Sequence, residues 1–522
     1  MGIYLNPGNA AFSEAVHSQI YVDKTELISY TNNVLATNQK NICVSRPRRF
    51  GKSITANMLA AYYSKGCQSD TLFKDRKISC SKDYKKYLNT YTTIFLNIQE
   101  FLSRSSNVEE LIQRIRRSLM REIRREYPTI DFYDELDLTE NMKEIYAETN
   151  EPFIIIIDEW DCVVRNSTDQ DLIHQYLQFL HSLFKSEESK SFLALGYITG
   201  IMPIKKIKDE SALNNFEEYT MLKSRPITKY YGFTEEEVKD LCKRYDMDFE
   251  TTKEWYNGYL IDGMHMYNPN SVSQAMKYHD FDSYWRNTSA FGTINNFIMM
   301  NYSGLKEDVL TMLSGGKVMV DTECFQNDLA EIHSKDDALT ALIHLGYLGY
   351  DADILSAYIP NYEVAKAFQS ALKTGEWKDV AASISKCDTL LMATISGNTE
   401  KVAELIELAH DTYTSILKYN DENSLSCVLT MAYFTAPAYY TIIREMPAGK
   451  GFADFVFLPR VNAGNRPAMI VELKYNQSAD TVIRQIKEKR YQGALSGYES
   501  KILLVGISYD SEKHHTCSIE EW

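Results

Sequence analysis

A chain of 522 residues is too long for one hydrophobic core, so about two to four domains are expected. With 44% hydrophobic and 24% charged residues, its composition is ordinary for a globular protein and excludes a low-complexity chain. The net charge of −15 argues against a protein that coats nucleic acid with its whole surface. Screening over about 10 Å still allows a local basic groove or a metal-mediated contact.

The membrane and compartment signals point to the cytoplasm. The longest apolar runs, such as Phe153–Ile157, fall far short of the roughly 20 residues that span a bilayer, so no membrane contact is expected. The start, MGIYLNPGNA, lacks the basic and apolar regions of a secretory signal. Nine cysteines without a CxxC pair or a metal-ligand spacing indicate reduced thiols instead of disulfides or a zinc site.

Residues 1–225 alternate short apolar runs with amphipathic stretches, which predicts an α/β domain with a parallel sheet. Nearly continuous apolar strands are expected where helices cover both faces of such a sheet. The predicted strands are Asn41–Ser45, Thr92–Ile98, Phe153–Ile157 and Phe192–Thr199.

A long arginine-rich helix is predicted at Asn107–Glu126. Its arginines lie between apolar positions, so the helix could follow the phosphates of a nucleic acid. A solvated face whose arginines pair with Glu109, Glu110 and Glu122 is the preferred interpretation.

The pattern becomes mainly helical over residues 226–385, where a helical middle domain is expected, with a winged-helix-like arrangement as one version. Thr234 is the predicted N-cap of a helix with acidic residues in its first turn. The aromatic residues Trp255, Tyr256 and Tyr259 could stack on bases. Packing against the first domain is the preferred interpretation.

Residues 386–522 end in a strand-rich α/β region. His514 and His515 have no partner with metal-ligand spacing, so they are expected at the exposed edge of a last hairpin. The predicted strands are Ala453–Leu458, Ala468–Leu473 and Ile502–Ile507, and Ala479–Leu495 is a predicted helix.

A phosphate-binding loop is predicted where the segment RPRRFGKS joins the first strand to the helical Ile54–Tyr63. Lys52 would reach the β- and γ-phosphates of ATP, Ser53 would bind Mg²⁺, and Gly51 would allow close backbone approach. The predicted nucleotide-contacting residues of the loop are Arg46, Arg48, Arg49, Phe50, Gly51, Lys52, Ser53 and Ile54.

The loop departs from the GxxxxGK[ST] pattern, because Arg46 stands at the position of the first glycine. The turn that enters the loop must therefore differ. Two roles stay open for Arg46, Arg48 and Arg49: further phosphate contacts, or a structural anchor for the unusual loop.

A second half of the ATP site is predicted at the end of the strand FIIII. There, Asp158 would hold the water shell of Mg²⁺ and Glu159 would polarise the attacking water. Thr199, at the end of the next strand, is the predicted sensor of the γ-phosphate. The alternative is that the GKS sequence occurs by chance and that Asp158 and Glu159 merely cap a strand. The two motifs follow predicted strands in the order that an ATP site requires, which argues against this alternative.

A metal-dependent nuclease site is predicted in the tail. Asp454 begins one strand, and Glu472 and Lys474 share one face of the next, since strand side chains alternate. The two carboxylates would hold Mg²⁺ or Mn²⁺, and Lys474 would steady the nucleophile or the developing charge. Alternating Glu and Lys on a solvated strand is the alternative, but the strand AMIVELK is strongly apolar.

Together these motifs resemble the bacterial AAA-ATPase-like family that carries a C-terminal PD-(D/E)XK nuclease domain. In that family an arginine at the first glycine position is normal, so the resemblance implies ATP binding, with hydrolysis inferred from the form of the motifs. The segments that carry it are YVDKT (21–25), RPRRFGKS (46–53), DEWD (158–161), TGI (199–201), YGFTEEEV (231–238), WYNGY (255–259), GFAD (451–454), VELK (471–474) and KILLVGIS (501–508).

The same resemblance implies supporting residues for the nuclease site. Glu422 would be an additional acid, although an exposed helical glutamate explains it equally well. Gln485 and Tyr491 would line the site from a helix, and Glu445 is an alternative structural acid.

The resulting hypothesis is an ATPase domain that controls a nuclease domain, with DNA as the favoured nucleic acid and RNA still open. One rival is a nucleotide-dependent regulatory or scaffolding protein with an inactive nuclease-like domain. Another is a protein that uses ATP as a structural ligand without turnover. Assembly into a homo-oligomer, and an arginine supplied by a neighbouring copy, also stay open.

Overall fold

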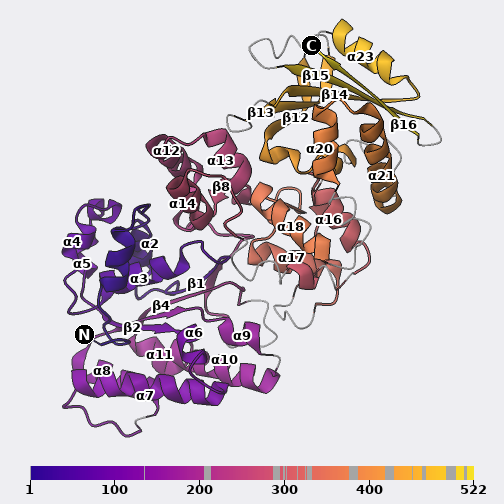
Figure 1. Ribbon diagram of the computed structural model, residues 1–522. Coiled ribbons are helices and arrows are strands. Elements are labelled where there is room, and N and C mark those ends of the chain that lie inside the picture. Colours follow the sequence, from indigo (N-terminus) through magenta and orange to yellow (C-terminus); the bar gives the residue numbers. More distant parts are fainter. Residues whose placement is uncertain are drawn as a thin grey trace. The chain divides into compact units, whose positions relative to one another are not determined.

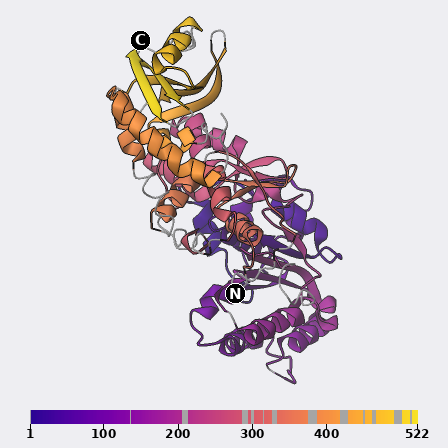
Figure 2. The same ribbon diagram turned by 90° about the vertical axis from the view of Figure 1, so that its right-hand side faces the viewer.

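The computed structural model divides into two compact units, shown from two sides in Figures 1 and 2. Unit 1 is Met1–Asp282 with Met319–Pro360, and unit 2 is Ser283–Val318 with Asn361–Trp522. The division at 225/226 and 385/386 stays a prediction. The structure describes residues 2–134, 136–167, 169–204, 213–285, 294–297, 300, 302–313, 315–323, 325, 332–374, 386–417, 428–448, 451–460, 466–489, 501–510 and 514–522.

Unit 1 is built on a five-stranded parallel sheet in the order β2-β3-β4-β1-β5. The first four strands confirm the predicted ones to within one residue at each end. The fifth was not predicted, because its sequence EEY is short and polar. β4 lies between β1 and β3, so their carboxyl ends meet at one edge. The strands are β1 (Asn41–Ser45), β2 (Thr92–Asn97), β3 (Phe153–Asp158), β4 (Leu193–Gly200) and β5 (Glu217–Tyr219).

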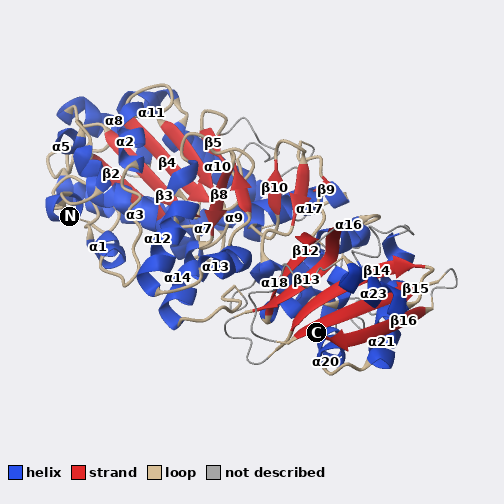
Figure 3. Cartoon of the chain, turned by 90° about the horizontal axis from the view of Figure 1, so that it is seen from above, coloured by secondary structure: helices blue, strands red, loops and turns tan. Residues whose placement is uncertain are grey.

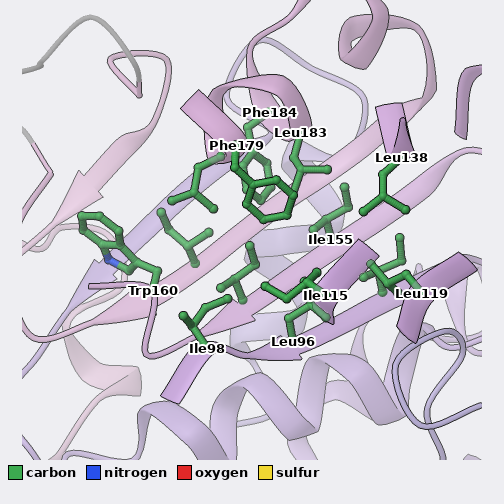
Figure 4. Packing of buried hydrophobic residues seen from close by; sticks show 14 of the residues in the cluster. Leu96, Ile98, Ile115, Leu119, Leu138, Ile155, Trp160, Phe179, Leu183 and Phe184 are labelled. Carbon is green, nitrogen blue, oxygen red and sulfur yellow. The ribbon is translucent and has the colours of Figure 1, made fainter. Parts of the chain in front are cut away.

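Helices cover both faces of this sheet, as its apolar strands predict. Because side chains alternate along a strand, Ile155 of β3 joins one buried cluster and Ile154 joins the other. Figure 4 shows Ile155 packed near Ile115 and Phe179. The first cluster includes residues of α7 (Val108–Glu126), α8 (Leu138–Thr149), α10 (Gln170–Phe184) and α11 (Glu187–Phe192), and the second includes residues of α1 (Ala10–Val16), α2 (Leu27–Val34) and α3 (Lys52–Tyr63).

The arginine-rich helix α7 is amphipathic, with a buried apolar face. Glu110 forms an ion pair with Arg114 at 2.6 Å, in agreement with the preferred interpretation. Glu122 differs, because it is buried and its carboxylate accepts hydrogen bonds from the backbone N–H groups of residues 3, 4 and 5. It therefore holds the start of the chain and does not pair with the arginines.

The later part of unit 1 is mainly helical, as predicted for the middle of the chain; its winged-helix-like form stays a prediction. Thr234 is the N-cap of α12, and it exchanges capping-box hydrogen bonds with Glu237. The elements are β6 (Phe233–Thr234), α12 (Glu235–Tyr245), α13 (Phe249–Tyr256), β7 (Tyr259–Ile261), β8 (Met264–Tyr267), α14 (Pro269–Tyr278), α17 (Lys335–Leu345), β10 (Gly349–Asp351) and β11 (Ser356–Tyr358).

Shorter elements complete the described part of unit 1. They are α4 (Asp70–Phe73), η1 (Lys77–Cys80), α5 (Tyr84–Tyr87), α6 (Ile98–Leu102), α9 (Cys162–Asn166) and η2 (Thr228–Tyr230); β9 (Val318–Met319) lies where the chain passes between units.

Unit 2 contains a five-stranded mixed sheet in the order β12-β13-β14-β15-β16 (Figure 3). β14 and β15 are parallel, and the other neighbours are antiparallel. The three predicted strands are confirmed and are longer than expected; β12 and β16 were not predicted. The strands are β12 (Tyr440–Ala448), β13 (Gly451–Pro459), β14 (Ala468–Tyr475), β15 (Ile502–Tyr509) and β16 (His515–Glu521).

The helix α23 packs on one face of this sheet, where Ile483 and Ile486 join Ile470 of β14 and Leu504 of β15. It confirms the first part of the predicted helix Ala479–Leu495, whose residues 490–495 lie outside the described ones. The helices of unit 2 are α16 (Leu305–Leu313), α18 (Tyr362–Thr374), α20 (Cys387–Ile395), α21 (Thr399–Leu417), η3 (Ala436–Ala438) and α23 (Ala479–Glu488).

One expectation for the tail is wrong. His515 is buried, and its Nε2 lies 2.9 Å from Nδ1 of the buried His410 on α21. The stacked ring of Tyr509 closes this cluster. Only the neighbouring His514 is exposed, because side chains alternate along the strand. Every helix among the described residues is too short or too polar to cross a membrane.

Candidate nucleotide site and candidate nuclease site

A cavity of about 1000 Å³ opens at the carboxyl ends of the parallel strands in unit 1. Its volume suits a ligand of the size of a nucleotide. Arg46, Asp158 and Thr199 of the predicted set do not line it. The predicted residues that do are Arg48, Arg49, Phe50, Gly51, Lys52, Ser53, Ile54 and Glu159.

The loop between β1 and α3 has the geometry that phosphate binding needs. Gly51 is the N-cap of α3 with a φ of 90°, a conformation that favours glycine. A Cβ atom there would meet nothing within 4 Å, so the space above the loop is open. The first N–H groups of α3 have no helical acceptor, and an anion can take their hydrogen bonds.

Lys52 begins α3 and is buried at the cavity wall. Its Nζ donates hydrogen bonds to the carbonyl oxygens of Arg46, at 3.0 Å, and Pro47, at 2.9 Å. Burial lowers the pKa of Lys52, and the nearby carboxylates of Glu159 and Asp158 oppose that shift. A negatively charged phosphate would stabilise the same ammonium group.

The guanidinium of Arg46 is fully buried and points into the protein. Its Nη1 donates to the carbonyl oxygens of Ser45, at 2.9 Å, and Tyr219, at 3.3 Å, and its Nη2 donates to the hydroxyl of Ser224. The ring of Tyr231 lies 5.6 Å from the guanidinium carbon. Burial lowers the pKa of Arg46 to about 10. These contacts favour the anchoring role for Arg46.

Phe50 is a second anchor of the loop. Its buried ring meets the ring of Tyr259 edge-on, with centroids 5.3 Å apart, and its carbonyl accepts the N–H of Gly232 at 3.1 Å. The hydroxyl of Tyr259 donates to the carbonyl of Gly346 at 2.8 Å. The preferred packing role of Tyr259 is thus confirmed.

Asp158, at the end of β3, is buried and held by two hydrogen bonds. Its Oδ1 accepts from the hydroxyl of Thr199 at 2.8 Å and from the N–H of Glu159 at 3.0 Å. Asn97 of β2 lies opposite Asp158 in the sheet register and lines the cavity. Asn97 was not among the predicted site residues, although it lies near the end of a predicted strand.

Glu159 follows β3 in a left-handed backbone conformation, with a φ of 54°. Burial raises the pKa of its carboxyl group. Its Oε2 accepts a hydrogen bond from Nη2 of Arg165 at 2.9 Å, and Nε of Arg165 donates to Oδ2 of Asp161 at 2.8 Å. Arg165 was not predicted; its spacing of four residues from Asp161 was the available signal.

Asp161 is itself fixed to the end of β4. Its Oδ2 accepts the N–H groups of Ile201, at 3.0 Å, and Met202, at 2.8 Å. A Cβ atom on Gly200 would lie 2.6 Å from Oδ1 of Asp161. Only glycine at this position therefore leaves room for the Asp161 carboxylate beside the end of β4.

The oxygen donors at the end of β3 and the start of α3 fit Mg²⁺, although Asp158 itself does not line the cavity. Asp158 and Glu159 supply carboxylate oxygens and Ser53 supplies a hydroxyl at the start of α3. Hard oxygen ligands of this kind, completed by phosphate oxygens and water, are the ones that Mg²⁺ prefers.

The predicted nuclease residues meet in unit 2. Asp454 on β13 donates its N–H to Oε2 of Glu472 at 3.2 Å, and its Oδ2 accepts the N–H of Leu473 at 2.7 Å. The ammonium of Lys474 lies 3.3 Å from Oε1 of Glu472. Glu472 is only 1% exposed, and burial followed by the charge of Asp454 raises the pKa of its carboxyl group.

Two adjacent carboxylates, one of them buried, fit a divalent cation, because a cation would relieve their repulsion. Over the described ranges, no group of three or more His, Cys, Asp or Glu side chains could hold a metal ion.

The other predicted residues of the nuclease site are placed only in part. Gln485 lies on α23. Glu445 is exposed on β12 with a φ of 48°. Glu422 and Tyr491 lie outside the described residues.

Two family models match separate parts of this chain. Residues 9–208 match the AAA-ATPase-like family model, described as predicted AAA-ATPase. Residues 420–522 match a model of the PD-(D/E)XK nuclease superfamily.

Two individual proteins are also similar. An uncharacterised protein in the vnfD 5′ region of Azotobacter chroococcum is 23% identical over 279 residues, which are 51% of this chain. The match spans about half of that relative, 50% of its length. The structure of the Aeropyrum pernix ORC2 protein in ADPNP–ADP complexes aligns with a TM-score of 0.31 at 10% identity, over 68% of this chain and 96% of that one.

The chain thus joins a region that is similar to the AAA-ATPase-like family, residues 9–208, to a region that is similar to the PD-(D/E)XK nuclease superfamily, residues 420–522.

Proposed function

We propose that unit 1 binds and hydrolyses ATP and that unit 2 cleaves phosphodiester bonds in nucleic acid under the control of that ATP site. The observation that carries this proposal is that one chain holds two separate clusters of carboxylates and a lysine. Lys52 with Asp158 and Glu159 forms one, and Lys474 with Asp454 and Glu472 forms the other.

In the ATPase reaction, Lys52 and the N-terminus of α3 bind the phosphates. Glu159 accepts a proton from water as the water oxygen bonds to the γ-phosphorus. The bond from that phosphorus to the β–γ bridging oxygen then breaks, and ADP leaves. Asp158 and Ser53 would hold Mg²⁺, whose charge would offset that of the phosphate oxygens.

In the nuclease reaction, Asp454 and Glu472 would hold a divalent cation, Mg²⁺ or Mn²⁺, which would supply activation of water and polarisation of the phosphate. Lys474 stabilises the negative charge that develops on the phosphate oxygens. The water oxygen bonds to phosphorus as the water gives up a proton to solvent, the phosphorus–oxygen bond to the leaving sugar breaks, and the leaving sugar oxygen takes a proton from solvent.

A regulatory or scaffolding protein with an inactive nuclease-like domain is the second candidate. It is favoured by the internal contacts of the cluster, since Asp454 and Glu472 both accept hydrogen bonds from the protein. Among the described residues, no third His, Cys, Asp or Glu side chain joins this pair to form a metal-holding group.

We favour DNA as the substrate and the cytoplasm as the compartment. The cysteines of the described residues are all free thiols, as a reducing compartment maintains them. Self-association into a homo-oligomer belongs to the same proposal and is testable by light scattering with and without ATP.

The test is cleavage of end-labelled single- and double-stranded DNA and RNA by the full chain, with Mg²⁺ or Mn²⁺, with and without ATP. Asp454→Ala should abolish cleavage, and Asp388→Ala, which changes an exposed aspartate on α20, should leave it intact. Cleavage that survives Asp454→Ala would assign the activity elsewhere. No cleavage of any substrate by the unchanged protein would support the regulatory alternative.

A further inference from the structure

Arg165 forms hydrogen bonds to Glu159, the candidate general base of the ATPase site, and to the buried Asp161. It lies on α9, lines the cavity together with Glu159, and its side chain is only 10% exposed. Two different nitrogen atoms of one guanidinium are engaged: Nη2 with Glu159 at 2.9 Å and Nε with Asp161 at 2.8 Å. A planar guanidinium cannot turn toward one carboxylate without changing its geometry to the other.

The Asp161 end of this connection is rigid. Asp161 is fully buried, and its Oδ2 accepts two backbone N–H groups from the segment after β4. These two backbone hydrogen bonds fix the carboxylate that in turn holds Arg165. The position of the Glu159 carboxylate is set from the end of the neighbouring strand.

The charge balance points the same way. Asp158, Glu159 and Asp161 bring three carboxylates to the end of β3, and buried carboxylates need cationic or hydrogen-bonding partners. Lys52 and Arg165 are the cations that act on Glu159. When Lys52 binds phosphate, Arg165 remains hydrogen-bonded to Glu159 and can still direct its carboxylate.

We propose that Arg165 is a positioning residue of the ATPase site, which holds the Glu159 carboxylate toward the attacking water by bridging it to Asp161. This inference rests on the proposed ATP hydrolysis. Arg165 acts through Glu159, so its removal should slow the chemical step and leave nucleotide binding nearly unchanged.

The experiment compares Arg165→Ala, Arg165→Lys, Glu159→Gln and the double variant Arg165→Ala/Glu159→Gln in the full chain. Arg165→Ala should lower kcat about tenfold to a hundredfold, while KM changes less than about threefold, since misplaced general bases lose rate and not affinity. Arg165→Lys should have a higher kcat than Arg165→Ala, because the lysine ammonium keeps the positive charge but cannot reach both carboxylates with separate nitrogen atoms. Arg114→Ala removes an arginine of the solvated ion pair on α7 and should leave kcat unchanged.

The double variant separates positioning from a structural role. If Arg165 acts through Glu159, Arg165→Ala causes no further loss in the Glu159→Gln background, as single-turnover measurements would show. A further loss of the same factor in that background would overturn the inference. So would a fall in kcat that is matched by weaker binding of a fluorescent ATP analogue and a lower unfolding temperature.

The failure of the inference and that of the proposed function are distinguishable. If Glu159→Gln stops hydrolysis and Arg165→Ala does not slow it, only the inference is overturned. If the unchanged protein hydrolyses no ATP, both are overturned.

Discussion

Thr199 and Asp158 face each other across β4 and β3, and the hydroxyl of Thr199 donates a hydrogen bond to Oδ1 of Asp158 at 2.8 Å. Both side chains are buried. The bond fixes the direction of the carboxylate that we assign to Mg²⁺. Thr199, the predicted sensor of the γ-phosphate, therefore donates its hydroxyl hydrogen bond to Asp158 in this structure and orients that carboxylate.

Thr199→Val should weaken the response to Mg²⁺, because it removes the hydroxyl and nearly keeps the shape. We expect the Mg²⁺ concentration for half-maximal ATPase activity to rise about tenfold or more, as for other changes to groups that orient a metal ligand. Thr199→Ser keeps the hydroxyl and is the control. Equal Mg²⁺ requirements for the Val and Ser variants would contradict the assignment.

Lys52→Ala should weaken ATP binding about tenfold to a hundredfold, since it removes a buried ammonium from the phosphate end of the cavity. Titration with a fluorescent ATP analogue measures this loss, and Lys74→Ala, an exposed lysine, is the control. Loss of thermal stability in the presence of ATP, with no turnover in either protein, would instead support ATP as a structural ligand.

Arg46→Ala and Arg48→Ala should separate anchoring from nucleotide contact. Removing Arg46 takes away the donor that its guanidinium supplies to the carbonyls of Ser45 and Tyr219, so we expect a loss of about 2–4 kcal/mol in the free energy of unfolding. Arg48 is exposed at the cavity, so Arg48→Ala should cost less than about 1 kcal/mol and weaken ATP binding. Chemical denaturation measures the first effect. A stable Arg46→Ala protein would exclude the anchoring role.

Glu472→Gln should stabilise the metal-free protein at neutral pH. The folded-state pKa of Glu472 is raised above its unfolded value of about 4.3, so the folded state binds this proton more tightly. The resulting stability is fully present below about pH 4 and is lost as pH rises through the folded pKa. The amide cannot ionise, so its advantage should be present at pH 7.5 and shrink toward pH 4.

Unfolding temperatures in EDTA at several pH values check this prediction, with the exposed Glu488→Gln as the control. Added Mn²⁺ should raise the unfolding temperature of the unchanged protein but not that of Glu472→Gln. An equal shift in both proteins would place the metal elsewhere.

Much of the fold follows from local patterns. The apolar runs of β1 to β4 predict strands because helices cover both faces of the sheet, and Thr234 predicts its helix start through capping. β5 and β12 escaped prediction, because EEY and YTIIREMPA are not continuous apolar runs. Their pairing partners, not their own sequences, decide their conformation.

In the candidate sites too, some features follow from local sequence rules and others depend on contacts between distant parts of the chain. Motif spacing brought Asp454, Glu472 and Lys474 together correctly, because a hairpin and strand alternation are local rules. The role of Arg46 and the bridge made by Arg165 depend on side-chain contacts that spacing does not encode. Arg46 contacts Tyr219, far along the chain, and only the assembled sheet places them together.

The contact between Phe50 and Tyr259 bears on how short a fragment can be made that keeps the proposed ATP site intact. A fragment trimmed to residues 9–208 would keep every motif residue of the site and would lose Tyr259, Gly232 and Ser224, which hold the loop from outside. Its loop would be free to collapse, and its nucleotide affinity would be a poor guide to that of the full chain. Fragments for crystallisation or binding assays should therefore extend at least through Pro360, the end of unit 1.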